Sequence, residues 1–253
     1  MSDISIINTT ISNITDFGVC GYKSLKKPGL PEKMNWLRDR FDEGLVIKTL
    51  LSENDGAQGM IEYIPGQFCW RPVDAADYMF IHCLFVGFKK AYKNKGYASQ
   101  LLEQCETDAK KSQLKGVSII TRKGSFMVGK DLFIRSGYEV VDTAKPDFEL
   151  LAKKFDTSAP DPKFRSNQHS YTNGLTIIRA DQCPYTIKNV NEIYEVAKKE
   201  FGLTVKVVDL KSYKDAQNSP CPFGSFCMIL DGEIVSYHPI SKGRFVNIMR
   251  KKR

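Results

Sequence analysis

Residues 85–99 read Phe85-Val86-Gly87-Phe88-Lys89-Lys90-Ala91-Tyr92-Lys93-Asn94-Lys95-Gly96-Tyr97-Ala98-Ser99, and they are the most informative part of this sequence. The apolar stretch Tyr78–Val86 leads into this basic loop, and the amphipathic stretch Tyr97–Gln113 follows it. The pattern predicts a buried strand, a loop and a helix. Small residues let the backbone approach an anion, and the N–H groups of a helix start point toward it. The segment therefore predicts a pyrophosphate site, with a solvated lysine-rich turn as the alternative.

The residues around this loop alternate between strand and helix patterns. Strands are expected at Ile4–Asn8, Leu45–Leu51, Gly59–Ile64, Tyr78–Val86, Val117–Thr121, Tyr138–Val141 and Phe148–Ala152. Helices are expected at Leu30–Phe41, Tyr97–Gln113 and Met127–Ser136. The order of these elements predicts one α/β domain over residues 1–155.

A polar stretch with two prolines follows, and we expect a linker at residues 156–172. A second, smaller α/β domain is expected over residues 173–253. Its strands are predicted at Leu175–Arg179, Thr204–Val208, Phe226–Leu230 and Ile234–Tyr237, and its helices at Pro184–Glu200 and Lys242–Arg250. Asp231-Gly232 predicts a tight hairpin turn between the last two strands.

Composition limits the class of protein. The 253 residues carry a net charge of +8, which suits an anionic partner such as a nucleotide cofactor, a nucleic acid or an acidic surface. No apolar run is long enough for a membrane span, and no signal peptide is visible. Seven scattered cysteines favour reduced thiols and a cytoplasmic location, and the lack of paired CxxC motifs argues against a metal site. Nucleic acid is a weak candidate without a recognition helix, and both a monomer and a homodimer stay open.

The loop resembles that of a known family. Lys93-Asn94-Lys95-Gly96-Tyr97-Ala98 is similar to the [Q/R]xxGx[G/A] loop of GNAT acetyltransferases, although Lys93 replaces the usual Gln or Arg. Leu132–Tyr138 resembles the later aromatic helix with its Gly-aromatic step, and the likeness covers residues 1–154. It implies a mixed, splayed sheet with helices on both faces. It also implies an acetyl-CoA N-acetyltransferase that acylates a primary amine directly, with a small molecule as the expected acceptor.

The resemblance assigns candidate residues for the cofactor. The pantetheine arm would lie in a gap between the strand ending near Val86 and the strand Val117–Thr121, along backbone of Leu84, Phe85 and Val86. The pyrophosphate would contact the loop and the helix start. The residues expected there are Lys93, Asn94, Lys95, Gly96, Tyr97, Ala98 and Ser99, with Ser125 and Phe133 as further cofactor contacts.

Catalytic candidates also follow from the family. Histone acetyltransferases of this family have a Glu base eleven residues before the first loop position, which is His82 here. Histidine titrates near neutrality and suits the role, but a core histidine is the alternative. The family's general acid, a Tyr, corresponds to Phe133, which cannot donate a proton. Tyr92, Tyr97 and Ser125 could replace it as the proton donor.

The acceptor is expected to contact the segment near residues 20–41 and the run Gln67–Arg71. Trp70 could form a pocket wall, and Arg71 could bind an acceptor carboxylate. A packed aromatic beside a surface charge is the alternative.

The second domain resembles a different fold. Cys183-Pro184-Tyr185 is similar to the active-site start of glutaredoxins and thioredoxins, and Pro220-Cys221-Pro222 to their cis-proline loop, with either proline as the cis one. The combination resembles acetyltransferases with a YoaP-like, thioredoxin-like C-terminal domain. Two roles compete for it: redox chemistry by Cys183, with Cys221 as its partner, or a redox-silent module. A redox or thiol-binding protein with a CoA-sensing first half is the alternative for the whole chain.

Overall fold

The computed structural model describes residues 4–22, 24, 26–124 and 126–252. The chain divides into two compact units. Unit 1 consists of Met1–Leu25, Leu37–Cys69 and Val73–Phe164, and unit 2 of Lys26–Trp36, Trp70–Pro72 and Arg165–Arg253. This division differs from the expected one, because two short segments of the first 155 residues belong to the second unit.

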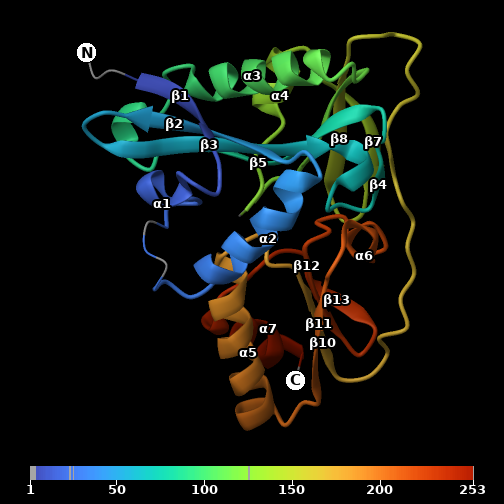
Figure 1. Ribbon diagram of the computed structural model, residues 1–253. Helices are drawn as coiled ribbons and strands as arrows, with labels where there is room; N and C mark the ends of the chain where they lie inside the picture. Colours follow the sequence, from blue (N-terminus) through green and yellow to red (C-terminus); the bar gives the residue numbers. More distant parts are fainter. Residues whose placement is uncertain (1–3, 23, 25, 125, 253) are drawn as a thin grey trace. The chain divides into compact units, whose positions relative to one another are not determined.

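Unit 1 contains a seven-stranded sheet in the order β1-β2-β3-β5-β6-β8-β7 (Figure 1). The strands are β1 (Ile4–Thr9), β2 (Val46–Ser52), β3 (Gly56–Pro65), β5 (Tyr78–Val86), β6 (Gly116–Thr121), β7 (Glu139–Ala144) and β8 (Phe148–Lys154). β5 and β6 pair in parallel, and the other neighbours pair antiparallel. The predicted mixed sheet is thereby confirmed.

Helix α3 (Tyr97–Lys111) packs on one face of this sheet (Figure 1). As its spacing predicted, Leu101, Leu102, Cys105 and Ala109 are buried, and they join a core with residues of β3, β5 and β6. The helix ends before the predicted Gln113, because Gln113 adopts a left-handed backbone conformation (φ 57°). The other helices of the first 155 residues are α1 (Ile14–Phe17), α2 (Leu30–Asp42), α4 (Asp131–Arg135) and the 3₁₀ turns η1 (Gly66–Phe68) and η2 (Lys90–Tyr92).

Two parts of unit 1 differ from the prediction. The helix expected at residues 127–136 is shorter and consists of α4 alone. Phe126 has a left-handed backbone (φ 65°), and Gly129 disfavours helix in the residues before α4. A short pair, β4 (Val73–Asp74) with β9 (Lys163–Phe164), was not predicted. β9 lies inside the stretch expected to be a linker, so part of that stretch forms a strand of unit 1.

Unit 2 contains a four-stranded sheet in the order β11-β10-β12-β13. Its elements are β10 (Leu175–Arg179), α5 (Tyr185–Phe201), β11 (Val205–Asp209), α6 (Tyr213–Gln217), β12 (Phe226–Leu230), β13 (Glu233–Ser236) and α7 (Lys242–Lys252). β10 runs parallel to β11 and antiparallel to β12, which forms the predicted hairpin with β13. The thioredoxin-like fold of this unit stays a prediction, and the expected cis bond at Pro220 or Pro222 is wrong. The one cis peptide bond of the described residues precedes Pro146.

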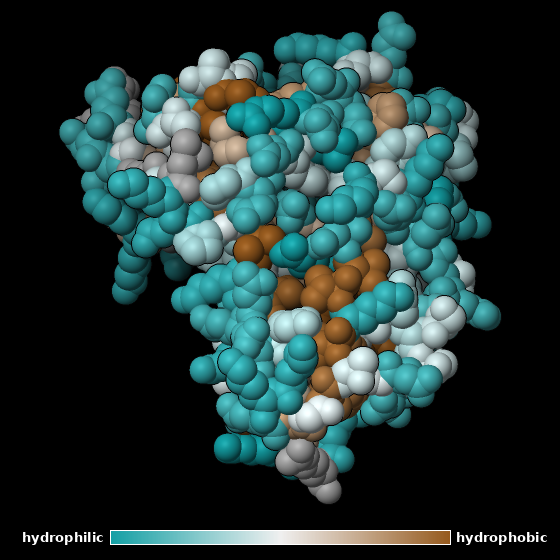
Figure 2. All heavy atoms as spheres, turned by 60° about the horizontal axis from the view of Figure 1, so that its bottom comes forward, coloured by the Kyte–Doolittle hydropathy of each residue, from teal (hydrophilic) through white to brown (hydrophobic). Residues whose placement is uncertain are grey.

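Figure 2 shows one face of the molecule. That face is mostly hydrophilic, with its largest hydrophobic patch near the middle and smaller ones near the top. Within the described residues, no helix is both long enough and apolar enough to cross a membrane.

Candidate active site

The central feature of unit 1 is a gap between its two parallel strands. β5 and β6 pair from Tyr78↔Gly116 to Ile81↔Ile119 and no further, although β5 continues to Val86 and β6 to Thr121. On its other side β5 stays paired with β3 as far as Val86. Leu84, Phe85 and Val86 therefore lie on a length of β5 whose β6 side has no strand partner. An extended ligand can hydrogen-bond to such a strand edge.

His82 lies where the two strands separate. It directly follows Ile81, the last residue of β5 paired with β6. A bulge also occurs at this point, because β3 residues Glu62 and Tyr63 pair with Cys83 and Ile81 and leave His82 as the extra residue. Bulges re-aim side chains and are frequent next to active sites. His82 is 8% exposed, and its Nδ1 lies 3.4 Å from Oε1 of Glu62.

The basic loop after β5 is shaped by left-handed residues. Gly87 (φ 98°), Asn94 (φ 58°) and Gly96 (φ 78°) all have positive φ, and Gly96 is the N-cap of α3. The first intrahelical bond of α3 is donated by Gln100 to the carbonyl of Gly96. The N–H groups of the three residues from Tyr97 to Ser99 thus precede the helical hydrogen-bond ladder. A Cβ added at Gly96 would meet no atom within 4 Å, so the space beside this helix start is open.

The charges of the loop complement an anion. Lys90, Lys93 and Lys95 are exposed, and the first turn of α3 holds no acidic residue. Of the loop lysines, Lys89 alone forms an ion pair in the described part of the chain, with Asp55. The helix dipole and these lysines both favour a negative group at Gly96. The residues expected at the pyrophosphate, Lys93 to Ser99, thus lie in one loop and helix start, and their role stays a prediction.

The environment of Tyr92 does not suit a proton donor to a thiolate. It is 6% exposed, and its hydroxyl bonds to Oγ of Ser52 at 2.9 Å and to Oδ2 of Asp55 at 2.8 Å. Both partners belong to the end of β2 and the turn that follows it. Hydrogen bonds from Lys89 and Tyr92 lower the pKa of Asp55. Tyr92 thus anchors the loop to the β2–β3 turn.

Two other candidates for the cofactor or for catalysis lie elsewhere. Phe133 is fully buried in the core beside α3, with its ring centroid 5.5 Å from that of Tyr138 in an edge-on contact. This position favours a packing role over an exposed contact with a cofactor. Ser125 lies outside the described residues.

Trp70 and Arg71 belong to unit 2 and are buried in it. The Trp70 ring contacts the Trp36 ring edge-on at 5.2 Å. Arg71 donates hydrogen bonds to the carbonyl of Trp70 at 2.7 Å and to Oε1 of Gln182 at 2.8 Å. Its guanidinium also lies 5.4 Å from the Phe223 ring centroid. The structure therefore groups these two residues with the second unit. Trp70 is a packed aromatic, but the surface charge of the alternative is wrong, because Arg71 is buried.

The cysteines of unit 2 occupy contrasting environments. Cys183 is half-buried directly before Pro184, the N-cap of α5. Cys221 is fully buried, and its thiol lies 3.6 Å from the carbonyl of Tyr237. Its hydrogen bond with Cys227, together with burial, raises the pKa of Cys227 well above its usual value. None of the seven cysteines, all among the described residues, is in a disulfide.

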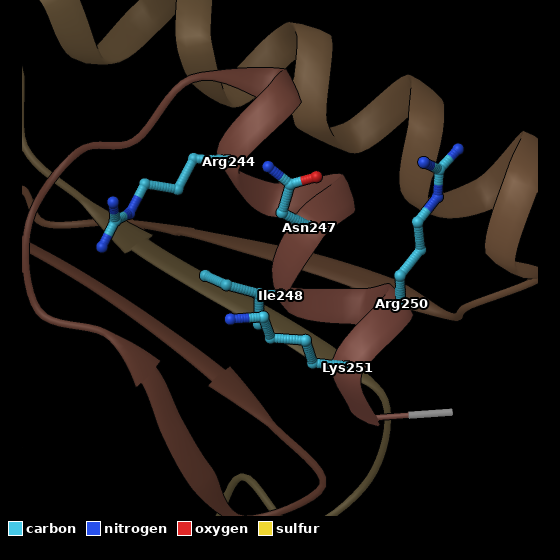
Figure 3. Close-up of a pocket in the computed structure, with 5 residues that line it drawn as sticks. All are labelled: Arg244, Asn247, Ile248, Arg250 and Lys251. Carbon is cyan, nitrogen blue, oxygen red and sulfur yellow. The ribbon is translucent and has the colours of Figure 1, made fainter.

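Two cavities complete the description. One of 860 Å³ in unit 1 opens at the carboxyl end of β6, between the loop after it and the β7–β8 hairpin. Ion pairs Arg122–Asp147 and Lys130–Glu149 cross between these two segments. The other, of 540 Å³, lies on α7 in unit 2 (Figure 3). Its Arg244 and Arg250 extend to opposite sides of the helix, so they form no common anion centre.

A parallel strand pair that separates before a basic loop and a helix N-terminus defines the GNAT class of acyltransferases suggested by the loop sequence. The sequence profile of the Acetyltransferase (GNAT) family matches residues 14–126, and that of the YoaP-like family matches residues 205–247. The "Uncharacterized N-acetyltransferase YoaP" of Bacillus subtilis (strain 168) is 33% identical over 250 residues, which cover 96% of this chain and 97% of that protein. The chain therefore belongs to the GNAT N-acetyltransferases with a YoaP-like C-terminal region. It is an acyltransferase whose cofactor is acetyl-CoA.

Two solved structures are similar to part of the chain at low identity. The PaiA N-acetyltransferase of Thermoplasma acidophilum in complex with coenzyme A is 18% identical, with a TM-score of 0.40, over 60% of this chain and 99% of that one. The ribosomal-protein-alanine N-acetyltransferase of Brucella melitensis is 15% identical, with a TM-score of 0.43, over 60% of this chain and 99% of that one.

Proposed function

We propose that this protein moves an acetyl group from acetyl-CoA directly to a primary amine of a small molecule, with His82 as general base. The observation that carries the proposal is the position of His82, at the point where β5 leaves β6. The thioester carbonyl must lie near this point if the pantetheine arm follows the free edge of β5. A base within reach of the attacking amine, directly or through one water, is what the chemistry requires.

The residues of unit 1 suit the cofactor. The open space beside Gly96 and the N–H groups after it fit a pyrophosphate, and the exposed lysines of the loop add complementary charge. The edge of β5 from Leu84 to Val86 fits the amides of a pantetheine arm. Bound there, acetyl-CoA supplies an activated acetyl group as a thioester.

The protein's own task is then to deliver a neutral amine. Most primary amines arrive as ammonium ions at neutral pH, and nitrogen can attack a carbonyl only after it has lost a proton. The side chain of His82 is fully buried, so in our proposal the proton reaches its Nε2 through a bound water. Because the Tyr92 hydroxyl is engaged with Ser52 and Asp55, we assign it a structural role instead of a catalytic one.

The cavity at the end of β6 supports a small acceptor. Its volume of 860 Å³ lies in the range of small-molecule sites. Among its lining carboxylates, Asp147 and Glu149 are paired with Arg122 and Lys130, so Asp131 is the one we assign to an acceptor amine. Seven cysteines without a disulfide among them support action in the reducing cytoplasm.

The test is a two-stage experiment on the full chain. Thermal unfolding is measured with acetyl-CoA, CoA and ATP, because a ligand at 100 times its Kd stabilises by about 2.7 kcal/mol. Release of CoA thiol is then measured against a panel of small amines, with His82→Ala beside the wild type. We expect both CoA species to raise the Tm more than ATP does, and His82→Ala to bind them but lose transfer. Binding without transfer to any amine would instead favour the CoA-sensing, thiol-binding alternative.

A further inference from the structure

Glu62 is a buried carboxylate in an otherwise apolar stretch of β3. Its side chain is 1% exposed and that of His82 is 0% exposed, and Oε1 of Glu62 lies 3.4 Å from Nδ1 of His82. Its neighbours Ile61 and Tyr63 are completely buried apolar or aromatic residues. Burying a carboxylate in such a place costs free energy that a hydrophobic residue would not. A role beyond packing would account for a glutamate here.

The sheet register places the two side chains together. Ile61 and Tyr63 belong to the core on the α3 side, so Glu62 faces the opposite side of the sheet. Ile81 belongs to the same core, and His82 likewise points away from it, with its ring 5.9 Å from that of Phe80. The bulge between β3 and β5 brings His82 out of the regular pairing beside Glu62. The pair therefore lies on one face of the sheet, at the edge of the gap.

We propose that Glu62 is the positioning residue for His82, an inference that rests on the proposed function. The carboxylate accepts the hydrogen of Nδ1, which fixes the tautomer that leaves Nε2 as the base. When Nε2 takes a proton from the amine, the ionised carboxylate stabilises the resulting imidazolium and itself stays unprotonated. At 3.4 Å the two atoms are within ion-pair distance but do not form a hydrogen bond in this structure, so the proposal requires the contact to tighten in the reacting complex, as catalytic hydrogen bonds often do.

The experiment is a double-mutant cycle with Glu62→Gln and His82→Ala in the full chain, measured with acetyl-CoA and an amine that the wild type acetylates. We expect Glu62→Gln to lower kcat at least ~10-fold while the KM for acetyl-CoA changes less than ~2-fold, as outer-shell partners of catalytic groups do. In the His82→Ala background, Glu62→Gln should cause no further loss, because it acts only through His82. A structural role would instead give additive losses.

A matched control comes from the same sheet. Thr49 of β2 forms a buried 2.6 Å hydrogen bond with Thr9, and Thr49→Val removes it away from the gap. This variant should lose stability yet keep its kcat, which shows that weakened packing alone does not slow the reaction. ¹⁵N NMR of the histidine ring gives a second readout. In the wild type the ring proton should reside on Nδ1, and in Glu62→Gln the preference for this tautomer should be lost.

The outcomes separate the two proposals. His82→Ala with full activity would overturn the base assignment and this inference with it. An inactive His82→Ala beside a fully active Glu62→Gln, or equal losses from Glu62→Gln with and without His82, would overturn the role of Glu62 alone.

Discussion

The hydroxyl of Tyr92 donates a 2.8 Å hydrogen bond to Oδ2 of Asp55, and Lys89 donates one to Oδ1 of the same carboxylate. These bonds connect the loop that precedes α3 to the turn between β2 and β3. The loop is thereby held in place before any ligand arrives. A preorganised loop spends less binding energy on becoming ordered.

Tyr92→Phe should therefore affect binding more than chemistry. Removing the hydroxyl releases the loop from Ser52 and Asp55, and we expect the KM for acetyl-CoA to rise about 3- to 10-fold, equivalent to the roughly 0.5–1.5 kcal/mol of one hydrogen bond. The kcat at saturating acetyl-CoA should stay within ~2-fold of wild type. Steady-state kinetics at varied acetyl-CoA concentration measure both quantities. A large fall in kcat with an unchanged KM would restore Tyr92 as a proton donor.

Gly96→Ala tests the anion site. Gly96 is left-handed (φ 78°), and an added methyl group would enter the open space in front of the helix. We expect roughly 1–2 kcal/mol of strain and at least a 10-fold weaker binding of acetyl-CoA, measured by titration calorimetry.

Gly202 provides the matched control for that experiment. It ends α5 in the same conformation (φ 65°), also with open space around an added Cβ. Gly202→Ala should lose similar stability and keep its affinity for acetyl-CoA. Equal affinities of the two variants would mean that Gly96 serves only as a helix start.

The core side of the sheet carries a stabilising polar network. Tyr63 donates a 2.6 Å hydrogen bond to Asp108 of α3, and Lys48 lies 2.9 Å from the same oxygen. Burial alone would raise the pKa of Asp108, but the bonds from Tyr63 and Lys48 outweigh it and lower that pKa. Tyr63→Phe should reduce the free energy of unfolding by about 1–3 kcal/mol in denaturant titrations.

The same network predicts a dependence of stability on pH. A carboxyl group with a lowered folded-state pKa stabilises the fold above its unfolded pKa of about 3.9, and this contribution is lost as pH falls through the lower folded value. The difference in stability between wild type and Asp108→Asn should thus be constant near neutral pH and shrink below about pH 4. A difference that persists unchanged at pH 2–3 would contradict the assignment.

The fold of both units was largely predictable because the periodicity of the sequence is strong. β5, β10 and β12 begin and end where the apolar runs do. The loop before α3 carried its own signal, as lysines and glycine between a strand and a helix. Glu62 also had a signal, because a single charge inside an apolar strand is unusual, although its partner His82 could not be read from that pattern.

Other features depend on residues far apart in the sequence. The bulge at His82 follows from the register between β3 and β5, which no local pattern reveals. The assignment of Arg71 to unit 2 follows from its bond to Gln182, 111 positions away. The two-residue strands β4 and β9 pair across a similar separation and have too few residues to show a period. Helix α6 was detectable in principle, since Ser212 and Asp215 form a capping box.

The last prediction concerns the thiols. Cys20, Cys83 and Cys183 are half-buried, whereas the other four cysteines are buried. A thiol reagent should therefore modify at most three cysteines quickly in the native chain, and Cys183→Ala should remove one of them. If unit 2 is redox-silent, Cys183→Ala keeps its acetyl transfer within ~2-fold of wild type and oxidised protein contains no Cys183–Cys221 disulfide. Loss of activity in Cys183→Ala, with its Tm and its acetyl-CoA binding unchanged, would show that the thiol takes part in the function, because a buried, structural cysteine would have changed stability first.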